Sequence, residues 1–388
     1  MDRRRFLAAG SLAATVPLLA GAGASARATA TAGPGRSLFQ RIDFTGDGLG
    51  LDPLEYATRL QEMAADDAFL ADNYSLGGAV ARLERTFANL LGKPAAMFVP
   101  TGTLANLLAV RRLAGGDRRV LVQAESHLFN DSGDGAQLLA GLNLVPLAPG
   151  QATLPLRDVQ AWVERSRGGR VRNDVGVISI ETPVRRLDHV AADFAELERV
   201  SRYARSEGIR LHLDGARLFA LPQHSGRPLQ AYTALFDTVY VSLWKHFNGA
   251  GGAILAGSED IIEGLFHERR MFGGALPAAW PQLALVEASA AGFQDDYALA
   301  WRRADALLGI LEASGRFRAR RLEGGSVRFF LSVRDADPSA FVRRIREQGI
   351  RMAMPVPGSG EIPLQVNATL LRTTPKTLSR GFMAALSA

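Results

Sequence analysis

The chain has 388 residues, of which 47% are hydrophobic and 22% charged, a composition typical of a globular protein and unlike that of a disordered one. Its formal net charge of +6 falls to +3 once residues 1–28, which carry four arginines and one aspartate, are set aside. So small a charge does not indicate nucleic-acid binding, and the lack of cysteine excludes disulfides, thiolate metal sites and lipid attachment through a thiol.

A twin-arginine-type signal peptide is predicted over residues 1–28. Its start contains three consecutive arginines, and an apolar stretch to about Ala22 and small residues suited to cleavage follow. Because this type of signal exports folded proteins, we expect a periplasmic or secreted protein, with an uncleaved membrane anchor as the alternative. Residues 29–42 are expected to form a linker rich in Gly, Thr and Ala.

The rest of the chain alternates strand-like apolar runs with helical patterns. Helices are expected at 104–113 and at 191–208, the second ending at Gly208. Runs typical of strands lie at 95–100, 119–124, 143–147, 174–180, 209–214, 237–243 and 252–257. This order predicts an α/β fold, in which helices cover a mostly parallel seven-stranded sheet in a large domain over residues 43–293.

The last hundred residues have a different pattern. A long arginine-rich helix from about residue 295, a strand at 327–333 and a helix at 338–349 predict a smaller α+β domain over residues 294–388.

Four groups of residues follow predicted strands, where ligands of α/β sheets bind. Thr101, Gly102 and Thr103 precede a helix, whose free N–H groups favour a phosphate, although such a turn alone is more often a plain helix cap. Asp214 ends a strand with apolar alternate residues, so it needs a positive partner: Arg217 in a structural ion pair, or a protonated ring nitrogen of a bound heterocycle.

The third and fourth groups are a lysine and a histidine. Lys245 is one of only three lysines, against 42 arginines, and it precedes a glycine-rich loop. A desolvated amine can lose its proton and attack a carbonyl, which a guanidinium cannot do. His127 follows another strand and could stack on a planar ring or act as a base. A phosphate cradle, an acid for a ring nitrogen, an amine and a stacking imidazole together indicate a pyridoxal 5′-phosphate (PLP) site.

The motifs that carry these residues resemble those of threonine aldolases, in the β-eliminating lyase family with the aspartate aminotransferase-like fold (PLP fold type I). The stretches "FVPTGTLANLLAV", "ESHLF", "GIRLHLDGARLF" and "RRMFGG" match in order and spacing. The resemblance covers about residues 43–290.

The resemblance implies retro-aldol cleavage of a β-hydroxy-α-amino acid to glycine and an aldehyde. Lys245 would form the internal aldimine, and Asp214 would pair with the pyridinium nitrogen. His127 would stack on the ring and handle the proton of the substrate hydroxyl. Thr101, Gly102 and Thr103 would hold the phosphate. Arg217 and Arg372 would contact the substrate carboxylate. The family also implies a homodimer or homotetramer.

Several positions depart from the family pattern. The N-terminal Ser-Asp-Thr motif is here Gly46-Asp47-Gly48, which lacks the hydroxyls. Trp244 replaces the serine before Lys245, and Arg372 is offset by one residue. After the strand at 174–180, Glu181 persists but the Asn-Thr-His pattern is absent. The cofactor half of the site therefore matches the family, whereas the substrate half is altered.

Two other functions remain open on this evidence. One is another PLP reaction of amino acids, such as β-elimination, racemisation or transamination. The other is a non-catalytic scaffold, against which the joint presence of Lys245, Asp214 and His127 argues. Six scattered histidines and no cysteine give no spacing typical of a catalytic zinc site, so no metal is expected.

Overall fold

The computed structural model describes residues 41–65 and 69–386, and the account that follows concerns these residues. The predicted signal peptide and all but the last two residues of the predicted linker lie outside them. Within the described part, no helix combines the length and apolarity needed to cross a membrane.

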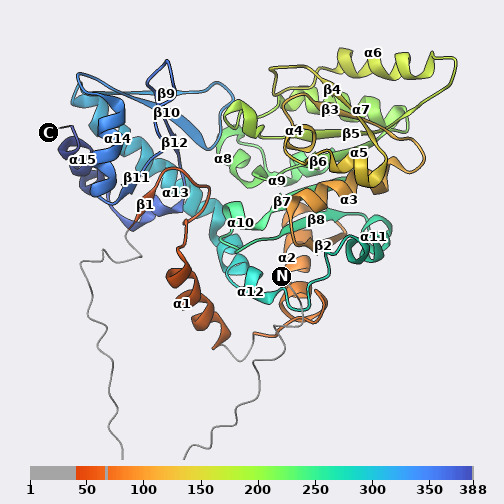
Figure 1. Ribbon diagram of the computed structural model, residues 1–388, viewed down its shortest axis with the longest axis horizontal. Coiled ribbons are helices and arrows are strands. Elements are labelled where there is room, and N and C mark those ends of the chain that lie inside the picture. The colour runs from red at the N-terminus through yellow and green to blue at the C-terminus, as the bar shows by residue number, and fades with distance from the viewer. Residues whose placement is uncertain (1–40, 66–68, 387–388) are drawn as a thin grey trace, which may run out of the picture. The chain divides into compact units, whose positions relative to one another are not determined.

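A seven-stranded sheet forms the centre of the fold, in the order β2-β8-β7-β6-β5-β3-β4 (Figure 1). Its strands are parallel except β8, which runs antiparallel to β2 and β7. The bounds, each within one residue of the prediction, are β2 Ala95–Val99, β3 Arg119–Gln123, β4 Asn143–Leu147, β5 Val175–Glu181, β6 Arg210–Asp214, β7 Thr238–Ser242 and β8 Ala253–Gly257. The predicted fold class is confirmed.

Helices cover both faces of this sheet, so its strands are buried on both sides. Val120 and Val122 of β3 belong to a core cluster that contains the α3 side chains, whereas Leu121 belongs to the second, larger cluster. This alternation is the two-residue period of a strand. The helices before α13 are α1 Pro53–Ala64, α2 Gly78–Leu91, α3 Gly102–Ala114, α4 His127–Asn130, α5 Gly135–Ala140, α6 Leu156–Arg167, α7 Phe194–Ser206, α8 Leu221–Ser225, α9 Leu229–Thr233, α10 Leu243–His246, α11 Glu259–Met271 and α12 Trp280–Leu283.

The C-terminal region begins within the 28-residue helix α13 (Val286–Ala313), which runs through the predicted domain boundary at 293. It contains an antiparallel sheet in the order β12-β10-β9 and two further helices. The bounds are β9 Phe317–Arg321, β10 Arg328–Val333, α14 Pro338–Glu347, β11 Ile350–Arg351, β12 Ile362–Gln365 and α15 Pro375–Ala384.

The first described residues belong with this C-terminal region. The short strand β1 (Ile42–Asp43) pairs in parallel with β11, and the Phe44 carbonyl accepts a hydrogen bond of 2.8 Å from the Gln365 N–H. Two segments more than 300 residues apart are thereby joined, which places the following turn, with Asp47, next to β12.

Charged side chains are buried between α2 and α11, away from the ends of the parallel strands. Arg269 is 1% exposed, and its guanidinium donates to the carbonyls of Phe98 and Ser75. Glu84 accepts a hydrogen bond of 2.8 Å from the Phe98 N–H. Burial raises the pKa of Glu84 to about 7, against the opposing effects of that hydrogen bond and of Arg269. At neutral pH this carboxyl is therefore poised between its two protonation states.

Glu84 makes stability depend on pH. Between its ordinary pKa of 4.5 and its folded value of about 7, the unfolded chain ionises Glu84 while the folded protein retains the proton, so stability falls as pH rises. We expect Glu84→Gln, whose amide oxygen can still accept from Phe98, to remove a decline of up to about 3 kcal/mol in unfolding free energy across this range. Urea titrations at pH 4.5 to 7.5 measure the unfolding free energy at each pH, and Glu347→Gln, at an exposed position, is the control. If the unfolding free energy of wild type and of Glu84→Gln changed equally with pH, the raised pKa of Glu84 would be contradicted.

Candidate active site

Two cavities meet at Lys245, beyond the carboxyl ends of the parallel strands. Lys245 lies in α10, directly after β7, and is 8% exposed. The smaller cavity, of about 270 Å³, is lined by Thr101, Gly102, Thr103 and His127 among others. The larger cavity, of about 580 Å³, is lined by Asp47 and by apolar residues of α1 and of the segment that precedes it. Lys245 and Trp244 line both, so the lysine amine is available to molecules in either.

The smaller cavity contains the start of α3. The Thr101 hydroxyl caps this helix by accepting from the Leu104 N–H at 3.2 Å, while Thr101 and Thr103 remain exposed. A Cβ at Gly102 would overlap the Tyr240 hydroxyl, so glycine is required for the turn to pass so close to β7. The first N–H groups of a helix, with no acceptor inside it, suit a phosphate at this position.

Asp214 is buried at the end of β6, 3% exposed, and a row of hydrogen bonds supports it from below. The Asn106 amide donates to Asp214 Oδ2 at 2.6 Å, Asn106 Oδ1 lies 2.9 Å from His212 Nε2, and His212 Nδ1 lies 2.8 Å from Thr238 Oγ1. All three supporting side chains are fully buried.

The direction of this row is determined by Asn106. Because its NH₂ donates to the aspartate, its oxygen must accept, so His212 carries its proton on Nε2 and its Nδ1 accepts from the Thr238 hydroxyl. Burial lowers the pKa of His212 to about 4, which keeps the ring neutral at pH 7. Each donor therefore points towards Asp214, whose charge remains available to a cationic group in the smaller cavity.

Lys245 lies within a field of both signs. Burial lowers its pKa, and the positive charge of Arg217 lowers it further, while Asp214, Asp47 and Glu181 oppose the shift. Among the described residues none hydrogen-bonds to Nζ, which lies 5.6 Å from the centre of the Trp244 ring. A lowered pKa favours the neutral, nucleophilic form of this amine.

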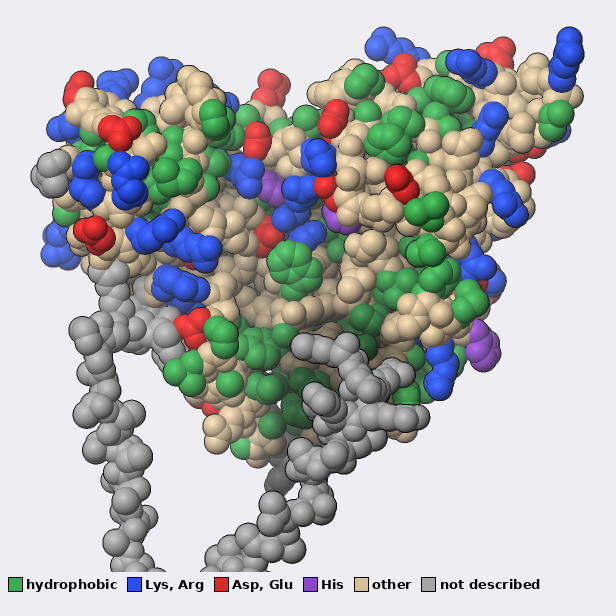
Figure 2. All heavy atoms as spheres, viewed as in Figure 1, with side chains coloured by type: hydrophobic (Ala, Val, Ile, Leu, Met, Phe, Trp, Pro, Cys, Tyr) green, Lys and Arg blue, Asp and Glu red, His purple; other side chains and the backbone are tan. Residues whose placement is uncertain are grey.

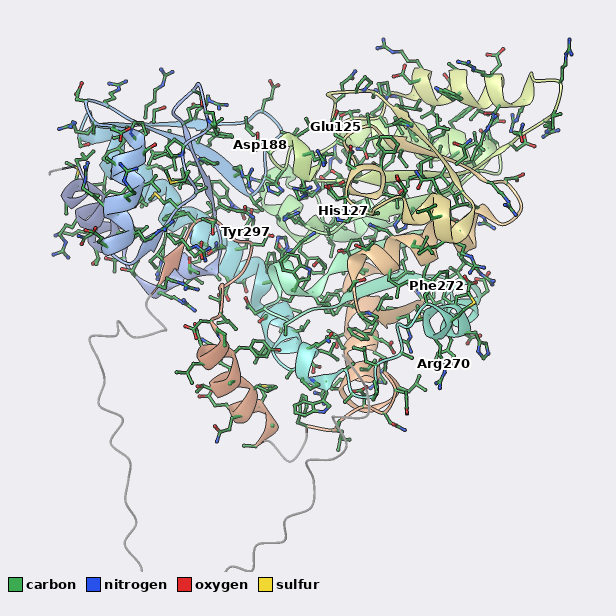
Figure 3. All side chains as sticks on the ribbon, in the orientation of Figure 1. Glu125, His127, Asp188, Arg270, Phe272 and Tyr297 are labelled. Carbon is green, nitrogen blue, oxygen red and sulfur yellow. The ribbon has the colours of Figure 1, made fainter. Side chains whose placement is uncertain are left out.

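His127 begins α4, directly after β3, and it faces the smaller cavity (Figure 3). Its backbone N–H donates to Glu181 Oε2 at 2.6 Å, and the other oxygen of Glu181 accepts from the Arg185 N–H at 2.9 Å. Burial lowers the pKa of His127, and its buried Nδ1 has no hydrogen-bond partner within the described part of the chain. Glu181 thus binds the backbone of two loops and fixes their positions. The lowered pKa favours the neutral imidazole of His127, which can accept a proton.

Arg217 forms a buried, two-pronged ion pair with Asp47. Its Nε and Nη2 donate to the two carboxylate oxygens at 2.7 and 2.8 Å, and the two side chains are 9% and 7% exposed. This pair lowers the pKa of Asp47 well below its usual range, although burial acts in the opposite direction. The Gln365 amide also donates to Asp47. Arg217 therefore lies beside the site with most of its charge already balanced.

Arg372 lies elsewhere. Its Nη2 donates to Glu55 Oε1 at 2.7 Å and its Nη1 to the Arg41 carbonyl at 3.0 Å. Glu55 is 1% exposed, and neither cavity is lined by Arg372. Of the other predicted site residues, five line the smaller cavity (Thr101, Gly102, Thr103, His127 and Lys245), and Asp214 and Arg217 lie close enough to Lys245 to influence its pKa. The charge of Arg372 is instead used to neutralise a buried carboxylate of α1.

The donor set fits PLP. The smaller cavity offers a helix start for a phosphate, an imidazole and a buried amine, and the buried carboxylate of Asp214 lies close enough to influence the pKa of both His127 and Lys245. Sequence reasoning missed Asn106, His212, Thr238 and Gln365. A signal was present for His212, because it interrupts an apolar strand two residues before Asp214 on the same face.

Comparisons with known proteins identify relatives of the chain. Residues 55–314 match the model of the family described as Beta-eliminating lyase. The low-specificity L-threonine aldolase of Saccharomyces cerevisiae is 29% identical over 197 residues, 50% of each chain. The alanine racemase TOXG of Cochliobolus carbonum is 28% identical over 239 residues, 61% of this chain and 59% of that one. The match therefore spans about half the length of these curated relatives.

A solved structure matches over more of the chain. The proposed L-allo-threonine aldolase of Listeria monocytogenes EGD-E is 25% identical, with a TM-score of 0.74 over 90% of this chain and 96% of that one. Homology to threonine aldolases is thus supported by both sequence and structure.

The hydrogen-bonded row below Asp214 predicts how Asn106 affects cofactor retention. Asn106→Leu is similar in size but leaves Asp214 Oδ2 and the His212 Nε2–H without partners. We expect PLP to dissociate about tenfold more readily, since an unpaired buried polar group costs about 1–3 kcal/mol. Equilibrium dialysis with PLP measures the change.

Thr238→Val, at the far end of the row, serves as the control and should have a smaller effect. Equal PLP affinity of wild type and a folded Asn106→Leu variant would show that the row has no influence on the cofactor.

Proposed function

The chain belongs to the Beta-eliminating lyase family, and we propose that it is a PLP-dependent lyase of the threonine aldolase type. The observation that carries the proposal is the position of Lys245, a buried amine at the junction of the two cavities to which no residue in 41–65 or 69–386 hydrogen-bonds. The smaller cavity suits the cofactor, which leaves the larger one to the substrate.

The reaction converts a β-hydroxy-α-amino acid to glycine and an aldehyde. The Cα–Cβ bond breaks, the β-hydroxyl loses its proton as it becomes the aldehyde oxygen, and Cα gains a proton. When bound, PLP supplies the electron sink for the bond that breaks.

The side chains divide the remaining work. Lys245 attaches the cofactor, and Asp214, supported by Asn106, binds its ring nitrogen. His127 is neutral and has an unpartnered Nδ1, so it can accept the hydroxyl proton and return it. Trp244 and Tyr56, which line the larger cavity, contribute apolar surface for the substrate side chain.

Aldehyde release tests the proposal. PLP-loaded protein is incubated with L-threonine, L-allo-threonine and β-phenylserine, and glycine and aldehyde are expected in equal amounts. Lys245→Ala should reduce the rate of aldehyde release by at least about 10³-fold, because the cofactor loses its covalent attachment. The control variant Lys376→Ala, at an exposed position, should keep the wild-type rate. Absence of aldehyde from wild type with all three compounds would contradict the proposal.

Racemisation is the second candidate, because TOXG, a relative at 28% identity, is described as an alanine racemase. It also needs a lysine-bound cofactor but no cleavage of a carbon–carbon bond. Formation of D-alanine from L-alanine without aldehyde release from the β-hydroxy compounds would favour it.

We also propose that the protein is exported with its leader removed. Support comes from the consecutive arginines and the apolar segment of residues 1–28. Intact-mass measurement of the protein from periplasmic extracts should give a chain that starts near residue 29. A full-length chain confined to the cytoplasm would contradict it.

We further propose a homodimer or homotetramer, as the family resemblance implies. Exposed apolar side chains beside the cavities, such as Trp244 (52% exposed) and Leu54 (64%), support it. Light scattering at the mass of a single chain would contradict it.

A further inference from the structure

The diversion of Arg372 to Glu55 leaves the substrate carboxylate with one expected partner, Arg217, whose own charge Asp47 largely balances. A carboxylate that enters beside Lys245 needs at least one further cation to offset its desolvation. Such a cation is present on β10, the strand that pairs with β12.

Arg328, at the start of β10, is joined to the Arg217–Asp47 pair by a continuous row of contacts. It lies opposite Gln365 in the β10–β12 ladder, with its Nη2 3.4 Å from Gln365 Oε1. The amide of the same Gln365 donates to Asp47. One glutamine side chain thus separates Arg328 from the carboxylate that binds Arg217.

A second contact orients Arg328. Its Nη1 donates to Asp188 Oδ1 at 2.7 Å. Asp188 belongs to the loop after β5 and His127 to the helix after β3, at the same end of the sheet (Figure 3). In the view of Figure 2, the region between the C-terminal strands and the central sheet contains Lys, Arg and His side chains interleaved with Asp and Glu side chains. Asp188 is 44% exposed at its side chain, so water screens its charge.

Two buried nitrogen atoms at this place have no hydrogen-bond partner among the residues that the structure describes. One is Nε of Arg328, and the other is Nδ1 of His189, a residue only 1% exposed. His189 lies among the charges concerned: after burial, the positive charges of Arg217, Arg328 and Lys245 lower its pKa, and Asp47 opposes them. Unpaired buried polar groups are costly, and an anion with two oxygens would offset part of that cost.

We propose that Arg328, rather than Arg372, is the second guanidinium of the substrate carboxylate site, opposite Arg217. Arg217 pairs with the buried carboxylate of Asp47, whereas Arg328 pairs with Asp188, whose charge is screened by water, so Arg328 can exchange that partner for a substrate carboxylate. Arg328 contacts the substrate and determines the preference for a free amino acid over its amide. This inference rests on the proposed use of an amino acid substrate.

The test is calorimetric binding of glycine and of glycinamide, which lacks the carboxylate, to the PLP-loaded protein. Wild type should bind glycine at least about tenfold more tightly. Arg328→Met should weaken glycine binding by about 10- to 100-fold and leave glycinamide within about threefold, because a hydrogen-bonded charge pair is lost.

The matched control is the double variant Glu55→Gln/Arg372→Met, which removes both charges of that buried pair together and so avoids an unpaired buried carboxylate. It should keep the wild-type preference for glycine. Arg328→Lys covers the case in which Arg328→Met does not fold. It keeps the charge but not the planar fork, so glycine binding should weaken by about 3- to 10-fold.

The inference is overturned if folded Arg328 variants keep the wild-type ratio of glycine to glycinamide affinity, or if the double variant loses it. It is also overturned if wild type binds both compounds equally. Failure of the proposed lyase function would give a different result. A wild-type protein that prefers glycine but releases no aldehyde would contradict the lyase function and leave the role of Arg328 intact.

Discussion

The ion pair between Arg217 and Asp47 connects the parts of the chain on which the site depends. Arg217 comes from the segment after β6, Asp47 lies 170 residues earlier, and Gln365, which also donates to Asp47, lies 318 residues after it. Removing two charges from water is expensive, and the cost is offset only by good geometry and further hydrogen bonds. The two-pronged contact and the glutamine amide supply both. The N-terminal turn and the C-terminal sheet are in this way held against the carboxyl ends of the parallel strands.

The two halves of the site use different physical means. On the cofactor side, neutral groups support Asp214 in a row from Thr238 through His212 to Asn106, and none of them competes for its charge. On the substrate side, charges predominate: Arg217, Arg328 and Lys245 face Asp47, and His189 is held among them. A neutral support keeps one carboxylate available for a permanent partner. A guanidinium whose carboxylate partner is exposed, as for Arg328 and Asp188, suits an anionic molecule that enters and leaves.

Much of the cofactor half could be predicted because its residues lie close to strand ends in the sequence. Lys245, Asp214 and His127 each follow a strand by at most four residues, and parallel strands deliver their carboxyl ends to one edge. Arg372 shows the limit of that reasoning. Its role was inferred from the family resemblance, but its partner Glu55 is 317 residues away and is buried in a helix that the sequence pattern did not reveal. The role of Asn106 was not predicted for a related reason: it lies on the buried face of α3, which is otherwise apolar, and its partners are distant in the sequence.

The sequence by itself determined the strands and their alternation with helices, because a two-residue or 3.6-residue period of apolar side chains is a local property. It also determined which chemical groups are present: one lysine after a strand, a carboxylate at the end of another and a glycine before a helix. Only the tertiary structure decided which charges meet. Coulombic pairing acts through space over a few ångströms, and β1 joins β11, Asp47 joins Arg217 and Glu55 captures Arg372 only after the chain has folded.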